Sequence, residues 1–439
     1  MGSHIPQPRH IVIIGGGVIG TTTAYYLTRH PAFNPSIHHI TLLEATSVGA
    51  AASGKAGGLL GLWAYPTCLV PLSYRLHAEL ATEHGGAQRW GYRTLECGQL
   101  TATVKEGGHP AQSPTARTRK RNSSGLPKQD VQDDWQKLPK QDAAASALLR
   151  PSVLPEDLDW INASLVREYA EMGLPGFTET AQVHPYQFTT SMAALARERG
   201  AEIRVNTKVT CIGLNKSGTA VSSVEYLDRA INETRTLRGV TDVVVAAGPW
   251  TGRLWPRARV EGLRAHSVVF TADVSPYAVF TDISLPNDWV PAHRAARGEK
   301  RKHRGNVDPE IYARPGGEVY ACGEPDSKIP LPETADQVEC DESQCDDLIS
   351  YIGTVSPVLR SAAIAAKQAC YLPRHMRFGK ESVPLIGGTS VGRLWIASGH
   401  TCWGIQNGPA TGKLMSEFIF EGEAKSADIA ELDPKRFKV

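Results

Sequence analysis

The chain has 439 residues, of which 41% are apolar and 21% charged, and its formal net charge is +2. This composition is typical of a globular protein with one large or two ordinary domains. The near balance of charge gives no reason to expect a nucleic-acid or membrane-surface partner. No apolar stretch reaches the roughly 18 residues that a membrane-spanning helix needs.

The eight cysteines show no spacing typical of a zinc site, so we expect no metal. The N-terminus is short and polar, unlike a secretory signal peptide. Reduced thiols are therefore favoured over disulfides, and we expect a cytoplasmic protein.

The first predicted elements form a βαβ unit. Residues 11–14 are an apolar, β-branched run typical of a buried strand, and residues 21–29 carry apolar side chains on one helical face. A second buried strand spans residues 39–43 and ends at Glu44. Residues 59–99 read as a mixture of helix and loop.

Residues 104–150 change in composition, being rich in polar and charged residues and poor in large apolar ones. We interpret them as an exposed insertion. It contains the basic run Arg117, Arg119, Lys120 and Arg121. This run is either a nuclear signal or polyanion contact, or a solvated loop, and we favour the solvated loop.

The rest of the chain predicts further strands and helices. A helix is expected at 186–200, followed by one strand at 202–212 and an antiparallel return through Val224. The remaining expectations are a buried strand at 242–247, strands of a second sheet at 267–272 and 319–321, a buried strand at 394–397 and a final helix at 409–420.

A glycine motif follows the first strand directly and opens the helix, as in G-x-G-x-x-G dinucleotide sites. Gly15 permits the tight turn, Gly17 lets the backbone approach a pyrophosphate, and Gly20 lets the helix pack closely on the strand. The free N–H groups near Val18 and Ile19 would face the phosphates with the positive end of the helix dipole.

An acidic residue at the end of the second strand strengthens this interpretation. The Glu44 carboxylate, with Ala45 beside it, can accept hydrogen bonds from ribose hydroxyls. It argues against an NADP 2′-phosphate, but by itself it leaves NAD and FAD open.

A second loop of small residues follows at 51–59. Small side chains let the chain run along a longer, extended cofactor, which favours FAD, although a plain flexible loop is the alternative. The predicted contacts to the cofactor in this loop are Ser53, Gly54, Lys55, Gly57, Gly58 and Leu59.

These segments resemble the superfamily of D-amino-acid oxidase, glycine oxidase and sarcosine oxidase, and within it a fungal and plant group of FAD-dependent oxidoreductases. Four blocks carry the resemblance: residues 11–44, 53–59, 242–250 and 394–412. Weaker matches lie at 183–185 and at Val209. The resemblance adds Val209, Ala247, Gly248, Trp250, Gly399, His400, Gly404 and Ile405 to the expected FAD contacts.

The resemblance implies an α/β fold in which a Rossmann-type FAD-binding domain is interleaved with an α+β substrate domain built on a mostly antiparallel sheet. The FAD domain would comprise 8–65, 165–260 and 360–439. The substrate domain would comprise 66–164 and 261–359, including the insertion.

The resemblance also implies the reaction. A C–N bond of a small amine or amino acid would be oxidised by hydride transfer to flavin N5, and oxygen would then reoxidise the flavin and give hydrogen peroxide. The protein would supply position and electrostatics to the flavin. The alternatives are an FAD-dependent dehydrogenase with another electron acceptor, and a flavin-binding interaction protein. The oligomeric state stays open.

Several residues depart from the family pattern. Relatives use a cysteine near Cys370 to hold the flavin as a thioether, and here Cys370 is either such a link or a small buried thiol. An arginine that clamps substrate carboxylates is replaced by Leu372, which questions a simple α-amino acid as substrate. A lysine that promotes oxygen reduction aligns loosely with Ala321.

The candidate catalytic residues are Tyr312, Arg314, His400 and Trp403. Arg314 is a substitute for the missing arginine, and Tyr312, with Tyr320, is a candidate pocket residue. His400 would stabilise reduced flavin or contact the ribityl chain, unless it is simply a core histidine. Trp403 and Trp63 are pocket walls or ordinary core residues.

Overall fold

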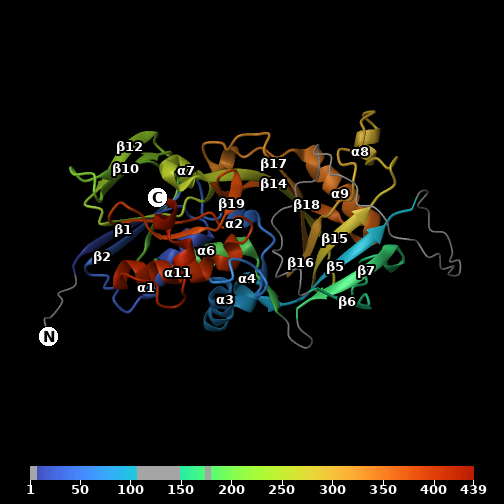
Figure 1. The fold of residues 1–439 in the computed structure, drawn as a ribbon, viewed down its shortest axis with the longest axis horizontal. Coiled ribbons are helices and arrows are strands. Elements are labelled where there is room, and N and C mark those ends of the chain that lie inside the picture. Colours follow the sequence, from blue (N-terminus) through green and yellow to red (C-terminus); the bar gives the residue numbers. More distant parts are fainter. Residues whose placement is uncertain (1–6, 106–148, 174–178) are drawn as a thin grey trace.

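The structure is a computed structural model that describes residues 7–105, 149–173 and 179–439 (Figure 1). The basic run at 117–121, and almost all of the insertion expected at 104–150, lie outside the described residues. Among the described residues, no helix combines the length and the apolar character that crossing a bilayer requires. All eight cysteines are described, and none is in a disulfide.

A six-stranded sheet forms one half of the molecule. It is parallel except for its antiparallel edge strand β20. The apolar runs that predicted its strands are buried on both faces, as expected for a parallel sheet. In spatial order the strands are β20 (Leu385–Gly388), β21 (Leu394–Ser398), β13 (Asp242–Val245), β1 (Arg9–Ile14), β2 (His38–Leu43) and β9 (Glu202–Arg204).

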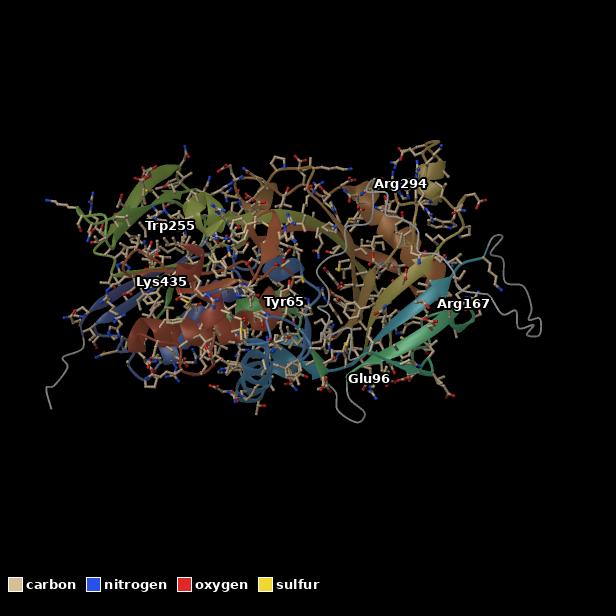
Figure 2. All side chains as sticks on the ribbon, in the orientation of Figure 1. Tyr65, Glu96, Arg167, Trp255, Arg294 and Lys435 are labelled. Carbon is tan, nitrogen blue, oxygen red and sulfur yellow. The ribbon has the colours of Figure 1, made fainter. Side chains whose placement is uncertain are left out.

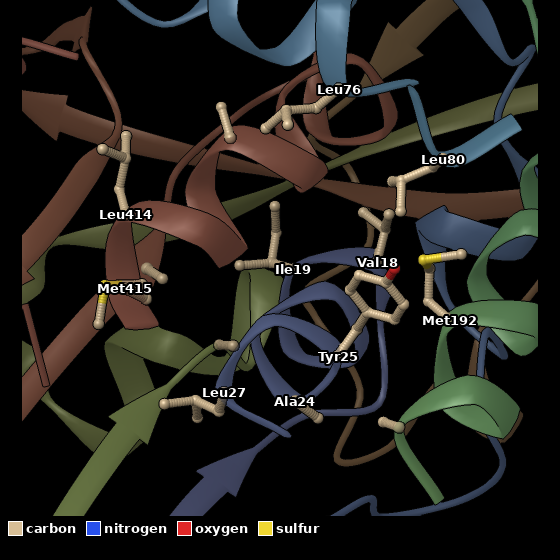
Figure 3. Close-up of a cluster of buried hydrophobic side chains, with 14 of the residues drawn as sticks. Val18, Ile19, Ala24, Tyr25, Leu27, Leu76, Leu80, Met192, Leu414 and Met415 are labelled. Carbon is tan, nitrogen blue, oxygen red and sulfur yellow. The ribbon is translucent and has the colours of Figure 1, made fainter. Parts of the chain in front are cut away.

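Four helices share one core with this sheet. They are α1 (Val18–Arg29), α3 (Val70–His84), α6 (Pro185–Glu198) and α11 (Gly404–Glu421). Figure 3 shows Val18, Ile19 and Tyr25 of α1 at the centre of this core. Leu76 and Leu80 of α3, Met192 of α6, and Leu414 and Met415 of α11 surround them.

The other face of the sheet packs against a small antiparallel sheet of β10 (Thr207–Leu214), β11 (Val221–Asp228) and β12 (Glu233–Arg238). One prediction is wrong here, because the single strand expected at 202–212 is two strands in different sheets. Asn206 separates them with a φ of 53°, a left-handed conformation that asparagine tolerates and that ends the extended run.

A nine-stranded sheet forms the other half of the molecule, and it is antiparallel except where β5 runs parallel to β15. In spatial order its strands are β19 (Lys380–Ser382), β18 (Ala363–Arg377), β14 (Val260–Thr271), β17 (Glu318–Asp326), β16 (Glu310–Arg314), β15 (Tyr277–Ser284), β5 (Glu96–Thr103), β7 (Val166–Met172) and β6 (Leu149–Ser152). One face packs against α9 (Glu342–Val355) and α10 (Pro357–Ser361). The long strands β14, β17 and β18 extend towards the six-stranded sheet (Figure 1).

The connecting segments contain short elements. The stretch 59–99, expected to mix helix and loop, also contains strands, namely β3 (Leu59–Gly61), β4 (Arg93–Thr94) and the start of β5. In a small three-stranded sheet, β3 and β4 lie on either side of β8 (Thr180–Gln182). The remaining helices are α2 (Ala52–Lys55), α4 (Gly86–Trp90), α7 (Thr251–Leu254) and α8 (Ala292–Ala295). The 3-10 turns are Ala163–Leu165, Gly248–Trp250, Pro256–Ala258, Ala335–Gln337, Ala430–Leu432 and Pro434–Phe437.

The mixed α/β architecture agrees with the predicted fold class, since a largely parallel sheet with helices lies beside a mostly antiparallel one. The strands do not follow the expected domain limits everywhere. β7, β18 and β19 fall in ranges expected for the FAD domain, yet all three are hydrogen-bonded in the nine-stranded sheet. The division into two interleaved domains therefore stays a proposal, with these three strands on the substrate side.

Candidate active site

A cavity of about 460 Å³ lies between the two large sheets. The six-stranded sheet and its loops contribute the glycine turn, Glu44 and Ala45 to its wall, and the small sheet contributes Val209. The nine-stranded sheet contributes Phe280, Glu310, Tyr312, Tyr320 and Cys370, which together with Trp403 we call the aromatic end.

The glycine turn has the geometry that its sequence predicts. Gly15 has a φ of +114°, which side chains rarely allow, and a Cβ on Gly20 would lie 1.9 Å from the Gly15 carbonyl oxygen. Gly17, Val18 and Ile19 line the cavity, whereas Gly20 is turned towards the strand. The N-cap residue Gly17 has no side chain to cover the start of α1, whose first residues line the cavity.

Two side chains brace this turn. The Glu44 carboxylate accepts hydrogen bonds from the Gly16 amide at 2.7 Å and from the Thr46 amide at 2.8 Å. Ser53 Oγ accepts a hydrogen bond from the Val18 amide at 2.9 Å. The carboxylate is thus fixed at the end of β2, where it lines the cavity.

The second small-residue loop lies only partly against the cavity. Ser53, Gly57, Gly58 and Leu59 line it, but Gly54 and Lys55 do not. Lys55 Nζ instead donates to the Ala369 carbonyl at 3.0 Å. Of the later residues, Ala247, Gly248, Trp250, His400, Gly404 and Ile405 line the cavity, and Gly399 does not.

His400 and Trp403 present buried polar atoms without a hydrogen-bond partner to this region, namely His400 Nδ1 and Trp403 Nε1. His400 Nε2 lies 3.1 Å from the Thr411 hydroxyl, which donates its own hydrogen to the Asn407 carbonyl. Nε2 therefore carries the ring hydrogen, and Nδ1 is an acceptor. Burial lowers the pKa of His400 to about 3, so the ring is neutral at pH 7.

Cys370 lies on β18, is 8% exposed and lines the cavity. Burial raises the pKa of its thiol to about 11, while the charge of nearby Lys55 opposes this shift. Few molecules carry the thiolate at pH 7, so the thiol behaves as a buried apolar group before any reaction. The covalent link to flavin stays a prediction.

The register of three strands places a carboxylate in the aromatic end. Glu310 on β16 lies opposite Phe280 on β15 and Cys322 on β17. The Tyr312 hydroxyl and the Cys322 thiol both donate to Glu310 Oε2. Burial, with the Glu310 carboxylate adding to it, raises the pKa of Tyr312 well above its usual value, so the hydroxyl keeps its hydrogen.

Arg314 does not line the cavity. Its guanidinium donates to the Ala56 carbonyl, lies 3.4 Å from Glu318 Oε2 and stacks over the Tyr320 ring, 4.8 Å from its centroid. These contacts occupy the group that we expected to replace the missing substrate-binding arginine. The structure therefore brings Tyr312, His400 and Trp403 to the cavity, but not Arg314.

Glu310, Phe280 and Cys322 are cavity residues that were not predicted from sequence. One signal was present for Glu310, because residues two apart on a strand share a face and Tyr312 was already a candidate. Ala321 belongs to the core on the α9 face of the sheet, whereas its neighbours Tyr320 and Cys322 line the cavity. A lysine at Ala321 would thus face away from the cavity.

Comparison with known proteins identifies the family. A sequence model described as "FAD dependent oxidoreductase" and named DAO matches residues 10–418. The chain belongs to the DAO family of FAD-dependent oxidoreductases. This confirms the predicted superfamily and makes the protein an enzyme with FAD as its cofactor.

Two sequence relatives and one solved structure show how far the likeness extends. The chain is 35% identical to the Saccharomyces cerevisiae protein named "Putative oxidoreductase TDA3", across 98% of this chain and 95% of that one. It is 24% identical to 4-methylaminobutanoate oxidase (formaldehyde-forming) of Paenarthrobacter nicotinovorans, across 99% of this chain but 46% of that protein. Glycine oxidase from Geobacillus kaustophilus has the same fold, with a TM-score of 0.62 at 19% identity over 98% of this chain and 99% of that one.

The cavity of this DAO-family member fits FAD. The open start of α1 and the fixed Glu44 carboxylate suit a pyrophosphate and a ribose. The unpartnered Nδ1 of His400 and Nε1 of Trp403 lie in the same wall, and FAD is a molecule with many polar groups able to satisfy them. An extended cofactor would reach from Glu44 to the aromatic end.

Proposed function

We propose that this enzyme oxidises the C–N bond of a small amine or amino acid. The observation that carries the proposal is the single cavity that joins the dinucleotide turn to a buried aromatic end. Support comes from the relative named 4-methylaminobutanoate oxidase, whose name describes oxidation of a methylamino compound. When bound, FAD supplies the acceptor for the substrate's hydride.

The residues of the cavity have distinct proposed roles. The α1 N-terminus and Ser53 hold the pyrophosphate, and Glu44 holds the ribose. His400 contacts the ribityl chain, because its neutral acceptor Nδ1 suits a hydroxyl and cannot offset negative charge. Trp403 and Tyr312 wall off water at the aromatic end, where both are buried.

Oxygen is our proposed electron acceptor, with hydrogen peroxide as product. A dehydrogenase is the second candidate, and one observation favours it. Among the described residues that line the cavity the only lysine is Lys208, which pairs with Glu333 at 2.5 Å and belongs to the small sheet. No lysine side chain therefore lines the aromatic end to favour electron transfer to oxygen, and Lys55, whose charge acts on Cys370, is bound to the Ala369 carbonyl outside the lining.

Anaerobic mixing of the holoenzyme with primary, secondary and tertiary amines and with D- and L-amino acids tests the reaction. We expect at least one of them to bleach the flavin absorbance. Peroxide released after admission of air indicates an oxidase, and dye reduction with little peroxide indicates a dehydrogenase. If no compound bleaches the flavin, the proposed oxidation fails and the alternative of a flavin-binding interaction protein is favoured.

A covalent flavin at Cys370 is tested separately. The thiol lines the cavity, so a thioether would require little movement. After denaturation, wild-type protein should retain yellow colour on the polypeptide, and Cys370→Ser should release it. Cys97→Ser, a buried thiol outside the cavity, is the control. Colour released from the wild type would show that FAD is held without a bond.

We also propose that the protein is cytoplasmic. Thiols without disulfides at all eight cysteines are compatible with the cytosol. Fractionation of cells that produce the tagged protein would locate it directly.

A further inference from the structure

The aromatic end contains a carboxylate, whereas the position at which the resemblance implies an arginine is occupied by Leu372. Glu310 is 6% exposed and lines the cavity between Phe280 and Cys322. Its oxygen Oε2 accepts hydrogen bonds from the Tyr312 hydroxyl and the Cys322 thiol. Both donors hold the carboxylate in place in the cavity wall.

Aromatic rings line the same end of the cavity as this carboxylate or pack against those that do. The Phe280 ring lies 6.1 Å from the Tyr312 ring, and the Tyr312 ring is stacked on Tyr320 at 5.9 Å. Trp63 packs edge-on against Phe280 at 5.9 Å and against Trp403 at 5.6 Å. Ring faces attract cations, and most strongly when water is excluded, as it is among these buried residues.

Among the described residues that line this end, no arginine or charged histidine is available to bind a substrate carboxylate. Leu372 lines the cavity on β18 within the same apolar cluster, and Arg314 is engaged with Ala56 and Glu318. Among the described residues that line the cavity the only arginine is Arg253, which donates to the Pro332 carbonyl at 2.9 Å and to Glu333 at 3.0 Å. His266 and His400 are neutral at pH 7, because burial lowers their pKa values to about 4 and about 3.

We propose that this enzyme recognises its substrate as an ammonium ion, which pairs with Glu310 against the aromatic rings and passes its proton to that carboxylate before the neutral amine loses hydride. The substrate is then an alkylated amine without a carboxylate beside the nitrogen. This inference rests on the proposed function and narrows it. Glu310 is then a substrate-binding residue, and Tyr312 positions it.

Binding of two ions that cannot be oxidised tests the proposal. Phenyltrimethylammonium has no nitrogen lone pair to support hydride loss, and benzoate has the same ring with the opposite charge. We expect calorimetry on the holoenzyme to show that the cation binds more tightly than benzoate. For Glu310→Gln, we expect cation binding to weaken by at least about tenfold.

The control variant is Glu96→Gln on β5, an exposed carboxylate of the same sheet that does not line the cavity and is labelled in Figure 2. It should bind the cation as the wild type does. Wild-type protein that prefers benzoate, or a Glu310→Gln protein with unchanged cation affinity, would overturn the proposal. The wild-type preference is decisive even if Glu310→Gln does not fold.

The outcome separates this inference from the proposed function. If amino acids bleach the flavin but phenyltrimethylammonium does not bind, the function stands and the recognition of an ammonium ion fails. If the cation binds through Glu310 but no amine bleaches the flavin, the site is a cation site and the proposed reaction fails.

Discussion

At the scale of single residues, buried histidines act here as neutral hydrogen-bonding groups. His77 is fully buried, and burial lowers its pKa to about 4. Its Nε2 donates to the Ile405 carbonyl at 2.9 Å. That carbonyl lies one turn before Pro409, which has no amide hydrogen to donate to it. The histidine thus replaces the helix hydrogen bond that proline removes.

Substitution of this histidine should destabilise the fold. His77→Ala leaves a cavity and an unsatisfied carbonyl, and we expect the free energy of unfolding to fall by about 3 kcal/mol. Urea titration monitored by circular dichroism measures this loss. Thr82→Ala, an exposed position on the same helix, should change it by less than about 0.5 kcal/mol. Equal stabilities of the two variants would contradict the role of His77.

The pH dependence of stability follows from the same burial. His77 and His266 have folded pKa values of about 4 and His400 of about 3, below the ordinary 6.5 of the unfolded chain. Above pH 6.5 both states are unprotonated at these sites, so they leave stability unchanged. As pH falls below 6.5, only the unfolded state takes up these protons, so stability is lost by up to about 4 kcal/mol per pH unit.

Urea unfolding at pH 7.5, 6.0 and 5.0 would reveal this slope. His77→Ala should show a shallower slope than the wild type, because one of the three groups is gone. His39→Ala, which removes an exposed histidine, should keep the wild-type slope. A wild-type profile that is flat from pH 7.5 to 5.0 contradicts the prediction.

At the scale of elements, the closeness of α1 to β1 decides whether the start of α1 faces the cavity. Gly20 sits against the Gly15 carbonyl, and α11 packs along the other side of α1, where Thr22 Oγ1 donates to the Gly408 carbonyl at 2.8 Å. The helix is therefore held from both sides, and its N-terminus has little freedom to shift.

A methyl group at Gly20 should push this helix away. Gly20→Ala places a Cβ 1.9 Å from a backbone oxygen, which must move. We expect a loss of about 3 kcal/mol in stability and weaker FAD retention on gel filtration. Gly305→Ala, where the added Cβ meets open space, is the matched control. Wild-type FAD content in Gly20→Ala would show that the close contact is not needed.

At the scale of the whole molecule, the cofactor cavity joins two sheets that have separate cores. One core lies between the six-stranded sheet and its helices, and another lies between the nine-stranded sheet and α9. Residues from both halves line the cavity. FAD bound in this cavity would contact both halves at once and couple their stability.

In Cys370→Ser protein, from which FAD can be removed whether or not the wild type bonds it, removal of FAD should loosen both sheets together. Adding back FAD at about 100 times its Kd should stabilise the apoprotein by about 2.7 kcal/mol. Hydrogen exchange should slow in both β1 and β16 on FAD binding. The exposed strand β12 should not change. Protection gained in only one of the two sheets would contradict coupling through the cavity.

Much of the cofactor site was predictable because its signals are local. The turn at Gly15, Gly17 and Gly20, and Glu44 at the end of the next strand, need only a strand, a tight turn and a helix in succession. The strands at 11–14 and 39–43 were predictable for the same reason, since their residues are buried whatever packs on them. The break at Asn206 was not, because a single left-handed residue leaves the alternation of the sequence intact.

The aromatic end depended on contacts between distant segments. Glu310 lies opposite Phe280 and Cys322 only because of the register of three strands. Arg314 donates a hydrogen bond to the Ala56 carbonyl, 258 positions away in the sequence. The amino-acid sequence by itself determined the cofactor and the family, because a phosphate-binding turn is a short-range structure. Only the tertiary structure decided which charged side chain of β16 lines the cavity. Glu310 and Arg314 share one face of that strand, and contacts with distant segments place Glu310 in the cavity wall while Arg314 binds the Ala56 carbonyl.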